Sequence, residues 1–159
     1  MPLLLRTVRQ SRWYKTEAAR WLEKGDVPSD PLGDLATTDN CLSVWEVEAD
    51  RSNIERIVRA VGVGRERIAD MGYVVFDSAL LSDAGIAVQV KDGASHDQGA
   101  NKWHRDLIDL SGNKLVRLTM LILRDGDSGV VLKGRLRELV AEGVRLKELP
   151  EDIGSKFSR

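Results

Sequence analysis

The chain has 159 residues, of which 42% are hydrophobic and 31% are charged, and its formal net charge is −1. This length suits one domain, and the near-zero charge excludes a general attraction of the whole molecule to nucleic acid or to an anionic membrane. The single cysteine, Cys41, excludes an internal disulfide, and no apolar run reaches the roughly 18 residues of a membrane span, so we expect a cytoplasmic protein.

The first part of the chain alternates predicted strands and helices. Residues 3–8 are rich in leucine and predict a strand, and a short helix is expected over residues 16–24. Residues 25–40 contain two prolines flanked by polar residues, which is typical of a long surface connection. Residues 42–48 predict a strand without a clearly polar face, and this strand places Trp45 in the core.

The best-supported helix begins at a predicted capping box formed by Ser52 and Glu55, and apolar residues at helical spacing continue it to residue 61. A second short helix is expected over residues 66–71. Two strands then follow, over residues 73–77 and 86–90, and the first of them places Phe76 in the core.

The later part of the chain supports two interpretations. Leucine-rich helical spacing favours a helix over residues 95–110 and another over residues 115–123, whereas a hairpin that turns at Gly112 is the alternative. A last helix is expected over residues 128–143, with Ser128 as its cap. The remaining residues from 151 to 159 are polar, and we expect a flexible tail there.

The predicted order of elements is β-α-β-α-α-β-β-α-α-α. This order indicates an α+β fold in which a small mixed sheet of four strands carries helices mainly on one face, within a single domain over residues 1–150. The predicted helix over residues 115–123 has apolar residues on all sides, so this chain or a second copy must cover it, and a homodimer is a further hypothesis.

Charge asymmetry at the start of the chain is the strongest functional signal. Six of the first 24 residues are basic and two are acidic. Basic side chains neutralise phosphates and aromatic rings stack on bases, so this segment predicts a nucleic-acid interface. Its candidate residues are Arg6, Arg9, Arg12, Trp13, Tyr14 and Lys15. The favoured alternative is structural: the two aromatic rings cover the edge of the core, and the arginines pair with acidic residues between positions 26 and 39.

A polar loop over residues 91–102 is a second candidate site. It follows a predicted strand, contains His96 and leads to His104, and these are the two histidines of the chain. An imidazole can transfer protons near neutral pH, so His96 is a candidate general acid or base. The two histidines are too far apart along a helix to share one metal ion. The alternative is that His96 is a surface residue of the loop.

Three residues resemble the pattern of restriction-type, metal-dependent nucleases. Asp77 ends one predicted strand, and Gln89 and Lys91 lie at the end of the next. The resemblance implies that the carboxylate holds Mg²⁺ and that the lysine stabilises the attacking water and the phosphate. The pattern covers only three residues, so Asp77 as a turn residue and Lys91 as a surface residue are the favoured alternative.

The sequence contains no catalytic triad, no spacing of metal ligands and no phosphate-binding loop. We therefore expect a small non-enzymatic accessory module that binds a protein or a nucleic acid, with no cofactor and no membrane contact. The alternative is a metal-dependent or His-assisted phosphodiesterase that uses Asp77, Gln89, Lys91 and His96, with Mg²⁺ as its cofactor.

Overall fold

The computed structural model describes residues 1–13 and 18–157, and its centre is one antiparallel sheet of six strands in the order β4-β5-β2-β1-β3-β6. The strands are β1 (Leu3–Val8), β2 (Leu42–Val47), β3 (Met71–Asp77), β4 (Ala87–Val90), β5 (His104–Ile108) and β6 (Asp127–Val131). The α+β class is confirmed. The prediction of a mixed sheet with four strands was wrong, because two strands lie where helices were expected.

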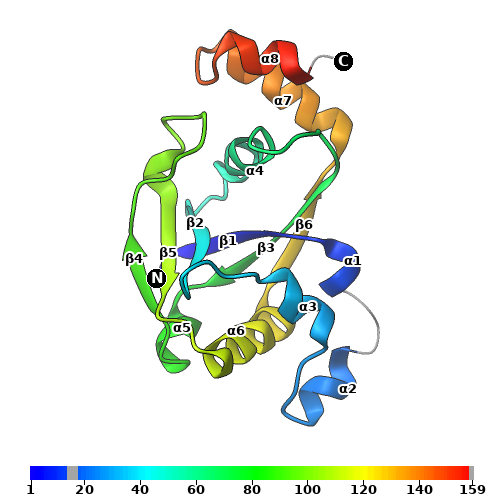
Figure 1. Cartoon of the computed structure of the whole chain (residues 1–159), viewed down its shortest axis with the longest axis vertical. Coiled ribbons are helices and arrows are strands. Elements are labelled where there is room, and N and C mark those ends of the chain that lie inside the picture. Colours follow the sequence, from blue (N-terminus) through cyan, green and yellow to red (C-terminus); the bar gives the residue numbers. More distant parts are fainter. Residues whose placement is uncertain (14–17, 158–159) are drawn as a thin grey trace.

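Helices pack on both faces of the sheet, so the prediction of helices mainly on one face was also wrong (Figure 1). One face is covered by α4 (Ile54–Gly62), α7 (Lys133–Arg145) and α8 (Glu151–Phe157). Elements on the other side are α1 (Gln10–Trp13), α2 (Ala18–Glu23), α3 (Ser29–Asp34), α5 (Ala79–Asp83) and α6 (Gly112–Asp125). The last of these contains residues 115–123, which confirms the helix there and excludes the hairpin at Gly112.

The two helical layers explain why the inner strands lack a polar face. Leu4 and Leu5 point to opposite sides of β1, and each is buried in a different apolar cluster. A strand that is covered on both sides has no polar alternation, since both sets of side chains are removed from water. Trp45 on β2 and Phe76 on β3 are buried, as the sequence predicted.

β5 and β6 replace parts of two predicted helices. Trp103, Leu107 and Leu110 fit helical spacing, but β2 and β4 pair with residues 104–108 and extend them as β5. Ser128 pairs with Val74 on β3 instead of capping a helix. In both places, hydrogen-bonded pairing with other strands outweighs the helical preference of the local sequence.

Shorter segments also differ from the predictions. The helix expected over residues 66–71 does not form, and β3 begins at Met71. The connection over residues 25–40 contains α3, and the short helix α5 follows β3. Where a tail was expected, α8 packs Ile153 and Phe157 into the core. Within the helix predicted over residues 16–24, the structure describes α2.

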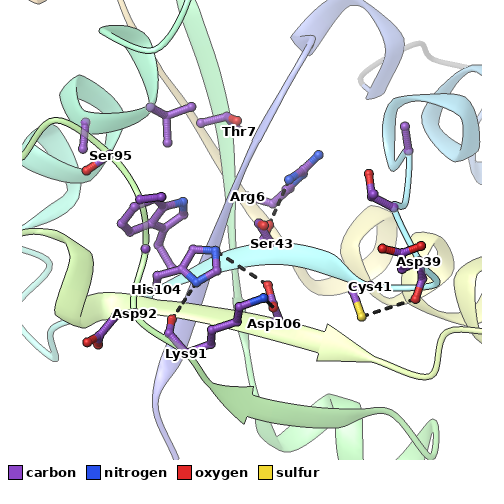
Figure 2. Close-up of a pocket in the computed structure, with 17 residues that line it drawn as sticks. Arg6, Thr7, Asp39, Cys41, Ser43, Lys91, Asp92, Ser95, His104 and Asp106 are labelled. Atoms are coloured by element: carbon purple, nitrogen blue, oxygen red, sulfur yellow. Dashed lines mark hydrogen bonds and ion pairs between the residues drawn. The ribbon is translucent and has the colours of Figure 1, made fainter.

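The sheet opens between β1 and β2 at one end. These strands pair from Leu3↔Val47 to Leu5↔Trp45 and no further. β1 nevertheless continues to pair with β3 as far as Val8, and β2 continues to pair with β5 as far as Leu42. Because each strand follows its other neighbour, the two diverge beyond Leu5 (Figure 2).

Candidate binding cleft

A cleft with a volume of about 710 Å³ lies where β1 and β2 diverge. Its floor is formed by β1, β2 and β5, and its walls come from residues near positions 36–41, from the loop at residues 91–95 and from the end of α4 (Figure 2). These segments are far apart in the sequence. A concave site in which polar groups from separate segments converge is the usual form of a ligand site.

Arg6 is a partly buried cation in this cleft (Figure 2). Its Nη1 donates a hydrogen bond to the backbone oxygen of Ser43, 2.9 Å away. That oxygen belongs to the part of β2 that no longer pairs with β1, so the guanidinium replaces a missing bond of the ladder. Its Nε atom is buried and has no hydrogen-bond partner among the described residues. Within the part of the chain that the structure describes, Arg6 makes no ion pair with a carboxylate.

The environment of Arg6 is unfavourable for its charge. Burial lowers the pKa of Arg6, the nearby carboxylate of Asp34 opposes this effect, and Arg65 adds to it. The Asp34 carboxylate accepts hydrogen bonds from Trp13 and from the backbone of Arg9. Arg6 is therefore a cation with less compensation than its burial requires.

His104, Asp106 and Lys91 form a second polar group in the cleft (Figure 2). His104 is buried beside Trp45, edge to face, with 5.2 Å between the ring centroids. Its Nδ1 lies 2.7 Å from the backbone oxygen of Lys91 and must donate to it, because a carbonyl only accepts. Nε2 therefore faces Asp106, whose Oδ1 is 3.7 Å away, and Lys91 Nζ lies 3.4 Å from Oδ2 of the same carboxylate.

The loop after β4 forms a tightly packed wall of the cleft. The backbone nitrogen of Gly93 donates to the backbone oxygen of Asn101, and the side-chain oxygen of Asn101 accepts from the backbone nitrogen of Ser95. A Cβ atom at Gly93 would lie 3.1 Å from both Trp45 and His104. Glycine at this position lets the loop approach the two rings closely.

A buried ionic cluster anchors this loop. Asp97 is fully buried; it accepts two hydrogen bonds of 2.8 Å from Arg56 and one of 2.7 Å from Arg59. Both arginines lie on α4 and also pair with Glu148, in the connection between α7 and α8. Burial acts to raise the pKa of Asp97, but the hydrogen bonds from the arginines outweigh it and lower the pKa. The sequence patterns did not indicate this cluster, because Arg59 lies beside the apolar stripe of its helix and its acidic partners are distant in the sequence.

The structure separates the residues of the nuclease hypothesis. β3, which carries Asp77, and β4, which leads to Lys91, are four strand spacings apart in the sheet, or roughly 19 Å. Asp77 is exposed, and its Oδ1 accepts from the backbone nitrogen of Ala79, as in a turn. Gln89 is exposed on the edge strand. No group of three or more His, Cys, Asp or Glu side chains among the described residues could hold a metal ion.

The structure places His104, and not His96, in the cleft. His96 is exposed on the loop and does not line the cleft, whereas His104 does. His104 was expected on a helix, and its place on β5 is what turns it toward Asp106. Because β5 was not predicted, the sequence contained no usable signal for this pair.

In the basic aromatic segment at the start of the chain, the described aromatic ring has a structural role. Trp13 is 1% exposed, and its indole nitrogen donates to Asp34 Oδ2, 2.8 Å away, so its ring is closed to a stacking base. The burial of this ring agrees with the structural alternative. The contacts with Asp34 come from the indole and from the Arg9 backbone, whereas that alternative predicted pairing by arginine side chains. Arg9 is exposed and Arg12 is half-buried. Tyr14 and Lys15 lie outside the described residues.

No protein-family model, curated protein or solved structure matches this chain, so its own geometry is the basis for any functional conclusion. Within residues 1–13 and 18–157, no helix has both the length and the apolar character needed to cross a membrane.

Proposed function

We propose that the protein is a non-enzymatic binding module that takes a polar group of its ligand or partner into the cleft between β1 and β2. The observation that carries this proposal is the convergence of Arg6, Lys91, His104 and Asp106 in one opening of the sheet. These residues come from β1, from the end of β4 and from β5. A sheet that closed fully between β1 and β2 would leave no such opening.

The contacts in the cleft favour binding over catalysis. Lys91 Nζ lies 3.4 Å from the Asp106 carboxylate, so these two charges compensate each other, and His104 Nε2 lies 3.7 Å from the same carboxylate. Nucleophilic catalysis requires a hydroxyl or thiol that is hydrogen-bonded to a base. Among the described residues of the cleft, no such side chain bonds to His104 or to a carboxylate; the Cys41 thiol contacts the backbone oxygen of Asp39.

A small molecule or a protein fits this site better than a nucleic acid does. Asp39, Asp92 and Asp106 line the cleft and would repel a chain of phosphates. The buried ring of Trp13 also removes one of the stacking platforms that a nucleic-acid interface would use. A cytoplasmic location and a homodimer stay predictions from the sequence.

Nuclear magnetic resonance can test the proposal, since Trp45 and His104 report on the cleft. Small acids, phosphates, amines and neutral polyols would be titrated separately at constant ionic strength. We expect at least one class to move the Trp45 and His104 signals to saturation while those of Trp13 and Trp21 stay in place. No movement with any class would contradict the proposal.

A blocking variant makes the test specific. Ala94 is exposed and lines the cleft, so Ala94→Trp should obstruct it and abolish the shifts. Ala141 is exposed on α7, away from the cleft, so Ala141→Trp is the matched control and should behave like the unchanged protein. Equal binding by both variants would place the ligand elsewhere.

A His-assisted enzyme is the second candidate function, and the position of His104 favours it. With Nδ1 held by Lys91, Nε2 is the ring atom that could accept a proton in the cleft. Hydrolysis of a phosphodiester such as bis-p-nitrophenyl phosphate would then disappear in His104→Gln and persist in His96→Gln. Absence of turnover in the unchanged protein would remove this candidate for that substrate.

A further inference from the structure

We infer that the group bound in the cleft is a carboxylate and that the Arg6 guanidinium binds it. This inference rests on the proposed binding function and adds the chemical class of the ligand. The shared chemistry has two sources, a free carboxylic acid or a carboxylate at the end of a protein chain, and both present two oxygens in one plane.

The first argument is the unmet hydrogen-bonding capacity of Arg6. Its one hydrogen bond to the described residues is from Nη1 to the Ser43 backbone oxygen, and its buried Nε has no acceptor. Arg59 Nε also lacks an acceptor, but the guanidinium of Arg59 pairs with two carboxylates, so the missing ion pair is what distinguishes Arg6. An anion in the cleft would compensate the charge of Arg6.

Arg6 also differs from three other arginines that are partly or fully buried. Arg56 and Arg59 bind Asp97, and Arg105 lies 2.7 Å from Glu46. In each of these cases the chain supplies a carboxylate. The Arg6 guanidinium also requires a compensating charge, and among the described residues the more distant carboxylate of Asp34 is the one that provides it.

The third argument concerns geometry and charge. With Nη1 engaged by Ser43 and Nε closed to water, Nη2 is the nitrogen left to donate to an oxygen of the ligand. One guanidinium compensates one negative charge. A phosphate dianion would meet Asp39, Asp92 and Asp106 in the same cleft, whose nearest lysine, Lys91, already faces Asp106. A single carboxylate is therefore the anion that fits best.

Acetate and inorganic phosphate are the probes that test this inference, each exchanged against chloride at constant ionic strength. The readouts are the Trp45 and His104 signals of the full chain. We expect acetate to bind to saturation and more tightly than phosphate. Arg6→Gln should weaken acetate by about tenfold or more, because the charge-assisted hydrogen bonds are lost, and Arg6→Lys should give an intermediate loss.

The matched control is Arg9→Gln, an exposed arginine from the same segment, which should bind acetate as the unchanged protein does. Dispersed amide spectra establish that each variant is folded. If Arg6→Gln and Arg6→Lys both bind acetate normally, or if phosphate binds more tightly than acetate, the inference is overturned.

The outcomes also separate the inference from the function beneath it. An amine or a polyol that moves Trp45 independently of Arg6 overturns the inference and leaves the binding function in place. If no compound moves the Trp45 signal, both the inference and the proposed binding function are contradicted. To distinguish the sources, a short peptide without acidic side chains would be compared with its C-terminally amidated form. Tighter binding of the free peptide than of acetate supports a protein terminus, and equal binding supports a small acid.

Discussion

Arg59 is buried and Arg6 is partly buried, and the two arginines differ in how far the surrounding residues compensate their charge. Arg59 is 3% exposed and has Asp97, Glu148 and the backbone oxygen of Leu139 around its guanidinium. Arg6 has one backbone oxygen and no ion pair among the described residues. Removing a charge from water costs several kcal/mol unless partners compensate it. The difference indicates a structural cation in the first case and a binding cation in the second.

The largest expected effect on stability comes from removing Asp97, the counter-ion of Arg56 and Arg59. Asp97→Asn leaves Arg56 and Arg59 without their main counter-ion, so we expect the free energy of unfolding to fall by about 3–5 kcal/mol. Urea unfolding at neutral pH measures this loss. Asp92→Asn is the control, since Asp92 is exposed on the same loop and should change stability by less than about 0.5 kcal/mol. Similar values for the two variants would contradict the assigned role of Asp97.

Acid should remove the same contribution in the unchanged protein. The pKa of Asp97 is lowered from its ordinary value of 3.8, so the unfolded chain takes up the proton more readily than the folded chain does. The contribution is therefore complete above the ordinary value and is lost as the pH falls through the folded value. The stability gap between the unchanged protein and Asp97→Asn should be constant near neutral pH and should shrink below about pH 4. A difference in stability that grows in acid would contradict the predicted direction of the pKa shift of Asp97.

Two glycines of α7 test how tightly the Arg59 site is packed. A Cβ atom at Gly143 would lie 2.7 Å from Arg59 Nη1 and 2.8 Å from Leu149 Cδ1, whereas a Cβ at Gly134 meets nothing within 4 Å. Gly143→Ala should cost about 1–3 kcal/mol through overpacking. Gly134→Ala should gain up to about 1 kcal/mol, because alanine favours the helix. Thermal unfolding of both variants measures the contrast, and a gain in both would show that the site has room to adjust.

The smallest expected effect on stability is at Arg6. Arg6→Met removes a guanidinium that has no ion pair, so stability should change by about 1 kcal/mol or less in either direction. Arg59→Met should cost about 3 kcal/mol or more, because it leaves Asp97 buried without one of its partners. Urea unfolding of the two variants under identical conditions is the measurement. A large loss at Arg6 would make it a structural residue.

The sequence predicted the elements whose pattern is local. β1, β2, β3 and α4 follow from apolar runs and spacing, and Trp45 and Phe76 lie in the core as expected. The capping box at Ser52 did not form, however: the Ser52 hydroxyl donates to Glu48, and Glu55 binds Arg135. The Ser52 contact stays within the connection before α4, whereas Glu55 contacts α7, which a local motif cannot anticipate.

The site depends on long-range pairing, which is why the sequence revealed little of it. Arg6 was singled out for its charge and Lys91 for its place after a strand, and both line the cleft. The partners of Lys91 could not be found, since His104 and Asp106 meet it only because β5 pairs with β4. Asp77 failed as a partner for the same reason, because the strand order sets it far from β4.

The Nε–H resonance of Arg6 gives the most direct test of the central claim, since it reports on a guanidinium that has no ion pair among the described residues. Its ¹⁵N signal can be assigned by its absence in Arg6→Lys and followed while acetate replaces chloride. The account predicts that the chemical shift of this signal changes to saturation, with the same acetate concentration at its midpoint as for the Trp45 signal. Exchange of the Nε proton with water should also slow. An Arg6 signal that stays fixed while Trp45 titrates would show that the anion binds elsewhere in the cleft and would contradict the account.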